Sequence, residues 1–216
     1  MSRWRRRKDI DQPGRGNPPT KSKTMKIETI EIAGLAGALT ALRLPFGKEV
    51  RSTITGKTDS YIAKNNTTGE RTHLVVWNGS VDINNKDLAL IQTLIKRGDE
   101  HAKVVRGINV WAKITAPVYF WAEAETYRAG HERLASESTM HIDVRGLSGE
   151  ELQRAKAAIP MGKELTKVDM FSYQTLRRIV AQRHDHRLPE WHQFIDWIKT
   201  LPLAEDLIFV GLETEE

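Results

Sequence analysis

Arginine side chains gather in two stretches that lie far apart along the chain. Arg128 and Arg133 belong to the first stretch, and Arg183 and Arg187 belong to the second. A guanidinium group stays charged and binds two phosphate oxygens at once. The two stretches therefore suggest one shared pocket for phosphorylated ligands. The alternative is that each arginine is solvated or paired with a nearby carboxylate, and the acidic neighbours are Glu123, Glu125, Glu132 and Asp185.

Other kinds of chemistry have weaker support in the sequence. The chain has no cysteine, which excludes disulfides, thiolate nucleophiles and cysteine-bound zinc or iron–sulfur centres. His184 and His186 flank Asp185, with His131 and His141 not far away, but residues two apart do not share a helix face. No fixed-spacing metal motif, P-loop or Gly-x-Gly-x-x-Gly motif is present. We therefore expect no metal site.

Length and composition favour one globular domain. The 216 residues suffice for a single sizeable core, with 39% hydrophobic and 28% charged residues. No apolar run is long enough for a membrane span, and no apolar segment of a secretory signal follows the basic start. We expect a cytoplasmic protein, in the host cytoplasm if the source is viral.

The positive charge is concentrated at the N-terminus. Residues 1–24 carry eight Lys or Arg and two Asp, a charge of +6, while the rest of the chain stands at −1. We expect this Pro- and Gly-containing tail to be disordered. It is a solubilising leader, an extension from an upstream start codon with Met25 as a second start, or an arm that binds nucleic-acid phosphates. The body itself does not have the charge of a nucleic-acid platform.

Hydrophobic periodicity predicts the elements of the first half. Ile27, Ile30 and Ile32 form a short β-prone stretch, which predicts a strand near residues 27–32, and a helix is expected over 35–44. Residues 46–70 are polar and turn-rich, so we expect a loop there. A strand over 74–77 should end at a turn formed by Asn78-Gly79.

The second half is expected to be largely helical. Capping asparagines at 84 and 85 predict a helix that ends at Gly98, and alternating apolar residues predict a strand over 108–114. Residues 145–167 are expected to be a loop with a short helix over 148–158, opened by a capping box of Ser148 and Glu151. The other expected helices span 118–129, about 172–183, and a segment with Pro189 in its first turn.

Residues 98–128 resemble a block of the flavin-dependent thymidylate synthases. That family has a Gly-His-x-Ser/Thr-Pro-Phe-Glu-His corner, a strand ending in Ala-Pro, a helix, and the signature Arg-His-Arg-x-x-Ser-x-Asn-x-x-Ser-x-Arg. Without a gap, His101 falls on the corner histidine, the Ala-Pro pair at 116–117 on its counterpart, and Arg128 on the third signature position. In the same register, Ser136 falls on the second signature serine.

The C-terminal part is similar as well, although the signature is degenerate. Ser172 takes the place of an asparagine that begins a helix in the family, and Arg183 that of an arginine eleven residues later. The resemblance covers roughly residues 86–200. The departures from the signature are Thr126 for Arg, Tyr127 for His, His131 for Ser, Arg133 for Asn and Ser138 for Arg. Those from the corner are Lys103 and Arg106.

The resemblance implies a fold, ligands and an assembly. The fold would be a single α/β (α+β) domain over residues 25–216, with a central mixed or antiparallel sheet flanked by helices. The ligands would be FAD and a pyrimidine nucleotide such as deoxyuridine monophosphate (dUMP), with folate as the carbon donor. The assembly would be a homotetramer with its sites between subunits. So divergent a copy would suit a viral, phage-like origin.

The resemblance also implies roles for individual residues. The catalytic residues would be Arg183, at the uracil ring, and His101, against the flavin ring. The residues binding the cofactor would be His101, Arg128, Ser172 and Arg187. Those binding the nucleotide would be Arg128, His131, Arg133, Ser136 and Arg183.

Three functional hypotheses follow. The first is a flavin-dependent enzyme that methylates or otherwise modifies a pyrimidine nucleotide. The second is a nucleotide- or nucleic-acid-binding protein on the same scaffold that has lost the flavin. The third is a nucleic-acid-associated protein that uses residues 1–24, with the body serving to oligomerise.

Overall fold

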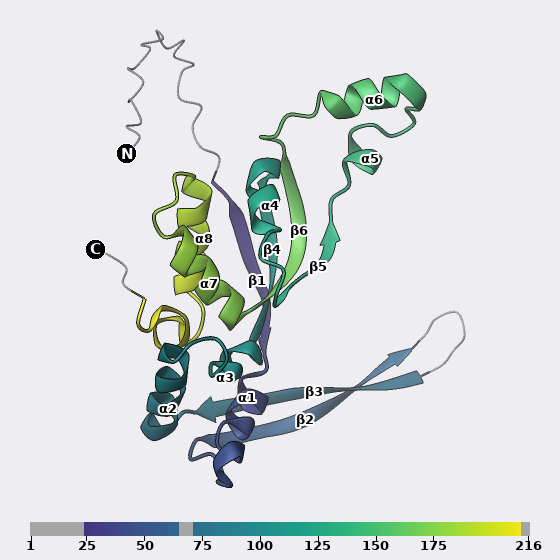
Figure 1. The fold of residues 1–216 in the computed structure, drawn as a ribbon. Coiled ribbons are helices and arrows are strands. Elements are labelled where there is room, and N and C mark those ends of the chain that lie inside the picture. The colour runs from purple at the N-terminus through teal and green to yellow at the C-terminus, as the bar shows by residue number, and fades with distance from the viewer. Residues whose placement is uncertain (1–23, 65–70, 213–216) are drawn as a thin grey trace, which may run out of the picture.

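The computed structural model describes residues 24–64 and 71–212 (Figure 1). The predicted tail over residues 1–24 lies outside this part of the chain except for its last residue. The strands are β1 (Lys26–Ala33), β2 (Thr53–Lys64), β3 (Arg71–Asp82), β4 (Asn109–Pro117), β5 (His131–Ser136) and β6 (Glu164–Ser172). The helices are α1 (Leu35–Ala41), α2 (Asn85–Lys96), α3 (Lys103–Arg106), α4 (Val118–Ala124), α5 (Thr139–Ile142), α6 (Gly149–Ala157), α7 (Tyr173–Arg183) and α8 (Pro189–Lys199), with a 3-10 turn at Leu44–Phe46 and a π-helical turn at Glu205–Phe209.

The centre of the molecule is a four-stranded antiparallel sheet in the order β1-β4-β6-β5. Its two inner strands, β4 and β6, pair without a break from Asn109↔Ser172 to Pro117↔Glu164. Helices α4, α7 and α8 flank this sheet (Figure 1). The predicted α/β class, with an antiparallel sheet and flanking helices, is confirmed.

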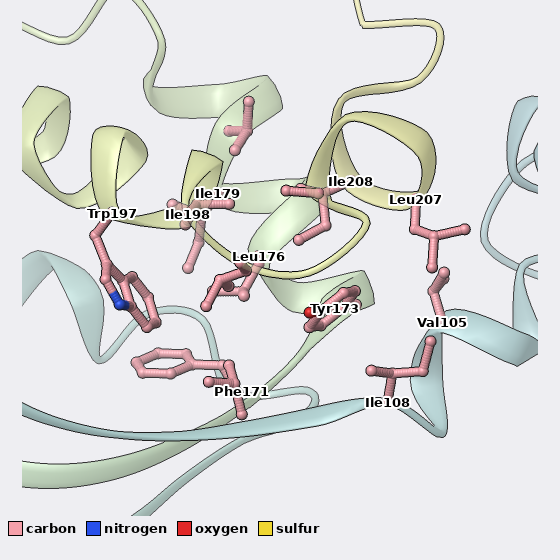
Figure 2. Close-up of a cluster of buried hydrophobic side chains, with 14 of the residues drawn as sticks. Val105, Ile108, Phe171, Tyr173, Leu176, Ile179, Trp197, Ile198, Leu207 and Ile208 are labelled. Carbon is pink, nitrogen blue, oxygen red and sulfur yellow. The ribbon is translucent and has the colours of Figure 1, made fainter. Parts of the chain in front are cut away.

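The core lies between this sheet and the C-terminal helices (Figure 2). Along β4 every second residue from Val110 to Ala116 is fully buried, as the alternation in the sequence predicts. Phe171 of β6 packs edge-to-face against Phe194 of α8, with ring centroids 5.7 Å apart. This packing holds α8 against the sheet.

Several predicted helix boundaries are confirmed by their capping geometry. The side chain of Asn84 caps α2 by accepting a hydrogen bond from the backbone nitrogen of Lys86 at 2.9 Å. Gly98, just beyond that helix, has a positive φ of 106°. Pro189 is the first residue of α8. In each case a short-range signal was enough to set the boundary.

The predicted loop over 46–70 is wrong. Thr53–Lys64 forms β2, which pairs in register with β3 from Thr53↔Asp82 to Lys64↔Arg71 and makes a hairpin (Figure 1). The Asn78-Gly79 pair, predicted as a turn, lies within β3. In the sequence, the glycines and asparagines of this stretch favour turns more strongly than its threonines favour a strand. In the structure, pairing with β3 overrides that local preference for turns. Residues 65–70 lie outside the described part of the chain.

The predicted pattern over 118–167 needs four corrections. Helix α4 ends at Ala124, five residues before the expected end. Strand β5, which sequence analysis missed, follows at His131–Ser136, and the expected loop over 145–167 already contains the start of β6. Ser148 is the N-cap of α6, but its side chain makes no capping hydrogen bond. Both missed strands carry several charged residues, which hid the period-two pattern.

No helix in the described part of the chain is both long and apolar enough to cross a membrane.

Candidate functional site

Three side chains of α7 form a polar stripe that faces the segment after α4. Thr175, Arg178 and Gln182 follow one another at spacings of three and four residues, which places them on one side of the helix. Together with Thr126, Tyr127, Arg128 and Ala129 they line a cavity of about 330 Å³. We call this the α7 cavity.

The wall opposite the stripe is held against the start of α7 by close contacts. Ser172, the N-cap of α7, accepts a hydrogen bond from Thr175 N, and its own backbone nitrogen donates to the Gly130 carbonyl at 2.7 Å. The Thr175 hydroxyl donates to the Ala129 carbonyl at 2.6 Å. Gly130 has a φ of 75°, and a Cβ there would lie 2.5 Å from Ser172 Oγ. The buried Ser172 side chain is therefore committed to the cap, and glycine is required at 130.

Arg128 lines a second cavity, on the other side of the same segment. Its lining residues are Glu125, Tyr127, Arg128, His131, Glu132 and Arg133, and its volume is about 400 Å³. We call it the β5 cavity. Arg128 is exposed, and it and Tyr127 line both cavities. The predicted cluster of Arg128, His131 and Arg133 is thus brought together at one place.

The two cavities differ in charge. No carboxylate lines the α7 cavity among the described residues, whereas Arg128 and Arg178 both do. In the β5 cavity the two arginines are opposed by Glu125 and Glu132. The α7 cavity is therefore the better candidate for binding an anion.

Arg133 is tied to the base of the β5 cavity. Its NH2 lies 2.7 Å from Glu125 Oε1, an oxygen that also accepts a hydrogen bond from the buried Lys167. Burial acts to raise the pKa of Glu125, but hydrogen bonds and charges of Lys167 and Arg133 outweigh it and hold that pKa below its usual value. Glu125 therefore stays ionised at neutral pH.

Arg178 is oriented by an acidic partner behind it. Arg178 Nε donates to Asp99 Oδ2 at 2.7 Å, and Gln174 donates to the Asp99 carbonyl. Burial acts to raise the pKa of Asp99, but the hydrogen bond and charge of Arg178 lower it overall. Arg106 also donates to the Asp99 carbonyl, at 2.6 Å. This cluster joins α7 to the segment that carries His101.

His101 lines a cavity of about 670 Å³, which we call the His101 cavity. Its lining is mostly apolar, with basic side chains of Arg97, His101 and Lys103 among the residues around it. The α1 region supplies much of the apolar wall, including Leu42 and Phe46. The full lining is Gly34, Gly37, Ala38, Ala41, Leu42, Pro45, Phe46, Leu94, Arg97, Glu100, His101, Lys103, Val104 and Gly107. Such a space suits a flat, apolar ring system with an anionic substituent.

The other predicted residues lie outside these cavities. Arg183 donates from Nε to the Tyr127 hydroxyl and from NH1 to Glu123, each at 2.9 Å. Ser136 donates its hydroxyl to the Glu137 carbonyl. Arg187 is exposed, beyond the end of α7. The roles predicted for these three residues stay predictions.

Sequence analysis missed the stripe of Thr175, Arg178 and Gln182. The signal was present, because the three residues recur at helical spacing beside the apolar face of α7, which is formed by Leu176, Ile179 and Val180. Within residues 24–64 and 71–212, no group of three or more His, Asp or Glu residues could hold a metal ion.

Comparison with known proteins supports the fold. No protein-family model matches the sequence, and no curated protein matches it either. Thymidylate synthase X of Helicobacter pylori, solved with FAD and dUMP, matches with a TM-score of 0.57 and 13% identity over 86% of this chain and 97% of its own. A second structure, described as the flavin-dependent thymidylate synthase of that organism complexed with FAD and dUMP, gives 0.58 and 12% over 88% and 100%. This chain has the fold of the flavin-dependent thymidylate synthases.

Proposed function

We propose that this protein binds a pyrimidine nucleotide and a flavin, and that it modifies the pyrimidine with the flavin's help. The observation that carries the proposal is the α7 cavity, where Arg128 and Arg178 come from two distant stretches of the chain and no described carboxylate lines the space between them. Guanidinium groups in this arrangement bind phosphate oxygens. Gln182, on the same wall, offers an amide that can pair with a pyrimidine edge.

The His101 cavity is the proposed place for the flavin. Its apolar lining fits the flavin ring, and Arg97 and Lys103 supply positive charge for the phosphates of the cofactor. A bound flavin would supply redox chemistry at the pyrimidine. Asp99 binds Arg178, which lines the α7 cavity, and the next two residues, Glu100 and His101, line the His101 cavity. One short segment, residues 99–101, therefore connects the two proposed ligand sites. Folate as the carbon donor and a homotetramer are further proposals that rest on the family resemblance.

Calorimetric titration with dUMP tests the nucleotide site. We expect wild-type protein to bind dUMP and to bind deoxyuridine at least about tenfold more weakly, because the nucleoside lacks the phosphate. Arg128→Ala and Arg178→Ala should each remove most of that difference. Arg145→Ala is the matched control, since Arg145 is exposed and lines none of the three cavities. Equal binding of dUMP and deoxyuridine by wild-type protein would contradict the nucleotide proposal.

Visible absorbance tests the flavin. Purified protein should carry bound flavin or take up added FAD, and Leu42→Glu, which places a charge in the wall of the His101 cavity, should reduce that uptake. Protein that binds dUMP but no flavin would favour a second candidate function, nucleotide binding without redox chemistry. The engagement of Arg183 by Glu123 and Tyr127 supports that candidate, since this arginine is the one predicted to contact the uracil ring.

A further inference from the structure

Two charged side chains lie on the buried side of the inner strand β6. Lys167 is 5% exposed and Asp169 is fully buried, and both alternate with residues that are only partly buried. Burying a charge costs several kcal/mol unless it is paired. The two charges do not pair with each other: Lys167 binds Glu125, and Asp169 contacts His131. Each is therefore used to hold the segment that lines the β5 cavity.

The contact between Asp169 and His131 requires a shared proton. His131 Nδ1 lies 3.0 Å from the Tyr127 carbonyl oxygen, so Nδ1 must carry the hydrogen of that bond. His131 Nε2 lies 2.8 Å from Asp169 Oδ2, and this second bond needs another hydrogen, on the ring or on the carboxyl. The ring is also stacked on Phe171, at 4.4 Å between centroids. Asp169 thus fixes the imidazole in one orientation.

The second oxygen of Asp169 has no hydrogen-bond partner among the described residues. Arg133 Nε lies 3.8 Å from this oxygen, close enough for an ion pair but too far for a hydrogen bond. Arg133 is also the cross-strand partner of Asp169, next to a bulge that places Leu134 outside the regular pairing. The carboxylate therefore stands between two residues, His131 and Arg133, that both line the β5 cavity.

We propose that Asp169 is a positioning residue for the nucleotide site. Through His131 it fixes the wall of the β5 cavity. The charge on its second oxygen attracts the guanidinium of Arg133, which Glu125 holds from the other end, so that Arg133 can bind a phosphate-bearing ligand beside Arg128. Arg128 lines both the β5 and the α7 cavities, so one anionic ligand can contact both arginines. This inference rests on the proposed nucleotide function. It assigns to the nucleotide site a residue, Asp169, that contacts no ligand itself.

Asp169→Asn is the decisive variant because it removes the charge and keeps the shape. The amide can donate to His131 Nε2 while Nδ1 still donates to the Tyr127 carbonyl, so the stacked ring should stay in place. Asp196→Asn is the control, since Asp196 is exposed and pairs only with Lys199 on the surface of α8. Thermal unfolding of each full-length variant confirms that it is folded before binding is measured.

Nitrogen-15 NMR of the side chains tests the positioning without any ligand. In wild-type protein we expect Nδ1 of His131 to be protonated and the Nε signal of Arg133 to be shifted by the carboxylate oxygen 3.8 Å away. In Asp169→Asn the His131 Nδ1 signal should stay that of a protonated nitrogen, and the Arg133 Nε signal should move from its wild-type position. An Arg133 signal unchanged by Asp169→Asn would overturn the proposal.

Calorimetry tests the consequence for binding. We expect Asp169→Asn to weaken dUMP about tenfold and to leave deoxyuridine unchanged. Arg133→Gln should cause the same loss, and the double variant should lose no more than either single one. Tighter dUMP binding by Asp169→Asn would show that the carboxylate only repels the phosphate. An equal loss of affinity for dUMP and deoxyuridine would show a general loss of structure. Either result contradicts the inference. If wild-type protein binds no dUMP, the proposed function fails, while the Arg133 signal still decides whether Asp169 positions that side chain.

Discussion

The guanidinium group of Arg183 lies over the indole ring of Trp191, with Cζ 4.7 Å from the ring centroid. The indole Nε1 and Arg183 NH1 both donate to Glu123 Oε2, each at 2.9 Å. His186 Nε2 lies 3.3 Å from the same oxygen. One carboxylate oxygen therefore joins α4 to the end of α7 and the start of α8. Arg183 therefore has a structural function in this arrangement, and its guanidinium group would have to leave these partners to contact a ligand.

Arg183→Ala should destabilise the fold by about 1–3 kcal/mol, because it removes a cation–π contact and two hydrogen bonds from a largely buried side chain. Urea unfolding measures the change. Arg187→Ala, four residues on and exposed, is the control and should change stability by less than about 0.5 kcal/mol. Unchanged stability of Arg183→Ala, together with lost dUMP binding, would instead assign the residue to the ligand.

Asp87 should contribute stability that is lost in acid. Its side chain is fully buried and accepts hydrogen bonds from Arg43 Nε, from Ser52 Oγ, and from the backbone nitrogens of Arg51 and Ser52. Burial acts to raise the pKa of Asp87, but these hydrogen bonds lower it below 3.8. The contribution is therefore present above pH 3.8 and disappears as the pH falls through the lower pKa of the folded state.

Asp87→Asn should cost about 2–4 kcal/mol at pH 7, because an amide cannot accept all four hydrogen bonds and leaves Arg43 without its counter-charge. Chemical unfolding between pH 7 and pH 2 checks the linkage. The difference from wild type should shrink toward the acid end. A difference that is constant over this range would show that the charge of Asp87 is not what stabilises the fold.

Gly130→Ala should destabilise the protein by more than its backbone strain alone. Gly130 and Gly146 both have positive φ, of 75° and 85°, but a Cβ at 130 would meet Ser172 Oγ and Thr175 Oγ1, whereas one at 146 would meet open space. We expect a loss of about 1 kcal/mol for Gly146→Ala and at least twice that for Gly130→Ala. Thermal unfolding compares the two, and equal losses would mean that the turn against α7 relaxes freely.

Tyr119 should make stability fall in alkali. Burial, and then its hydrogen bond to the buried Glu190, raise the pKa of Tyr119 from 10.0 to about 12. Between pH 10 and about 12 the folded chain keeps a proton that the unfolded chain loses, so stability decreases as the pH rises through this window. Tyr119→Phe should lower stability by about 1–3 kcal/mol at pH 7, since it leaves Glu190 unpaired. The stability of this variant should change less between pH 10 and about 12 than that of wild type. Equal slopes for the two proteins would contradict this assignment.

The helices were predictable because their signals are local. Asn84 caps α2 with its side chain, Ser172 caps α7, and Pro189 occupies the first position of α8. Each of these residues acts on the backbone within three positions of itself. The helical stripe of α8, with Trp191 and Phe194 buried, likewise needs no knowledge of distant partners.

The missed strands depend on contacts that sequence does not reveal. On β6 the buried positions include Lys167 and Asp169, so the side that faces inward reads as polar. Only the partners Glu125 and His131, more than 35 residues away, make that pattern stable. Strand β5 is an edge strand with nearly all of its residues exposed, and it offers no apolar period.

The candidate site was predictable in part. Matching to the family's spacing placed Arg128, His131 and Arg133 at one location, and these three line the β5 cavity. It could not find Arg178, because that residue becomes part of the site through the turn at Gly130, which lays residues 126–129 against α7. Nor could spacing show that Arg183 is already engaged by Glu123.

The hairpin of β2 and β3 begins and ends at paired residues, since Thr53 and Asp82 are partners in its register. Ile54 and Val81, at its base, pack against the core, and the two strands beyond them project from the body (Figure 1). A short linker could therefore replace the projecting part without rerouting the chain on either side. The same position would accept a foreign peptide or a reporter domain, which makes it a natural place to equip this scaffold with a second module.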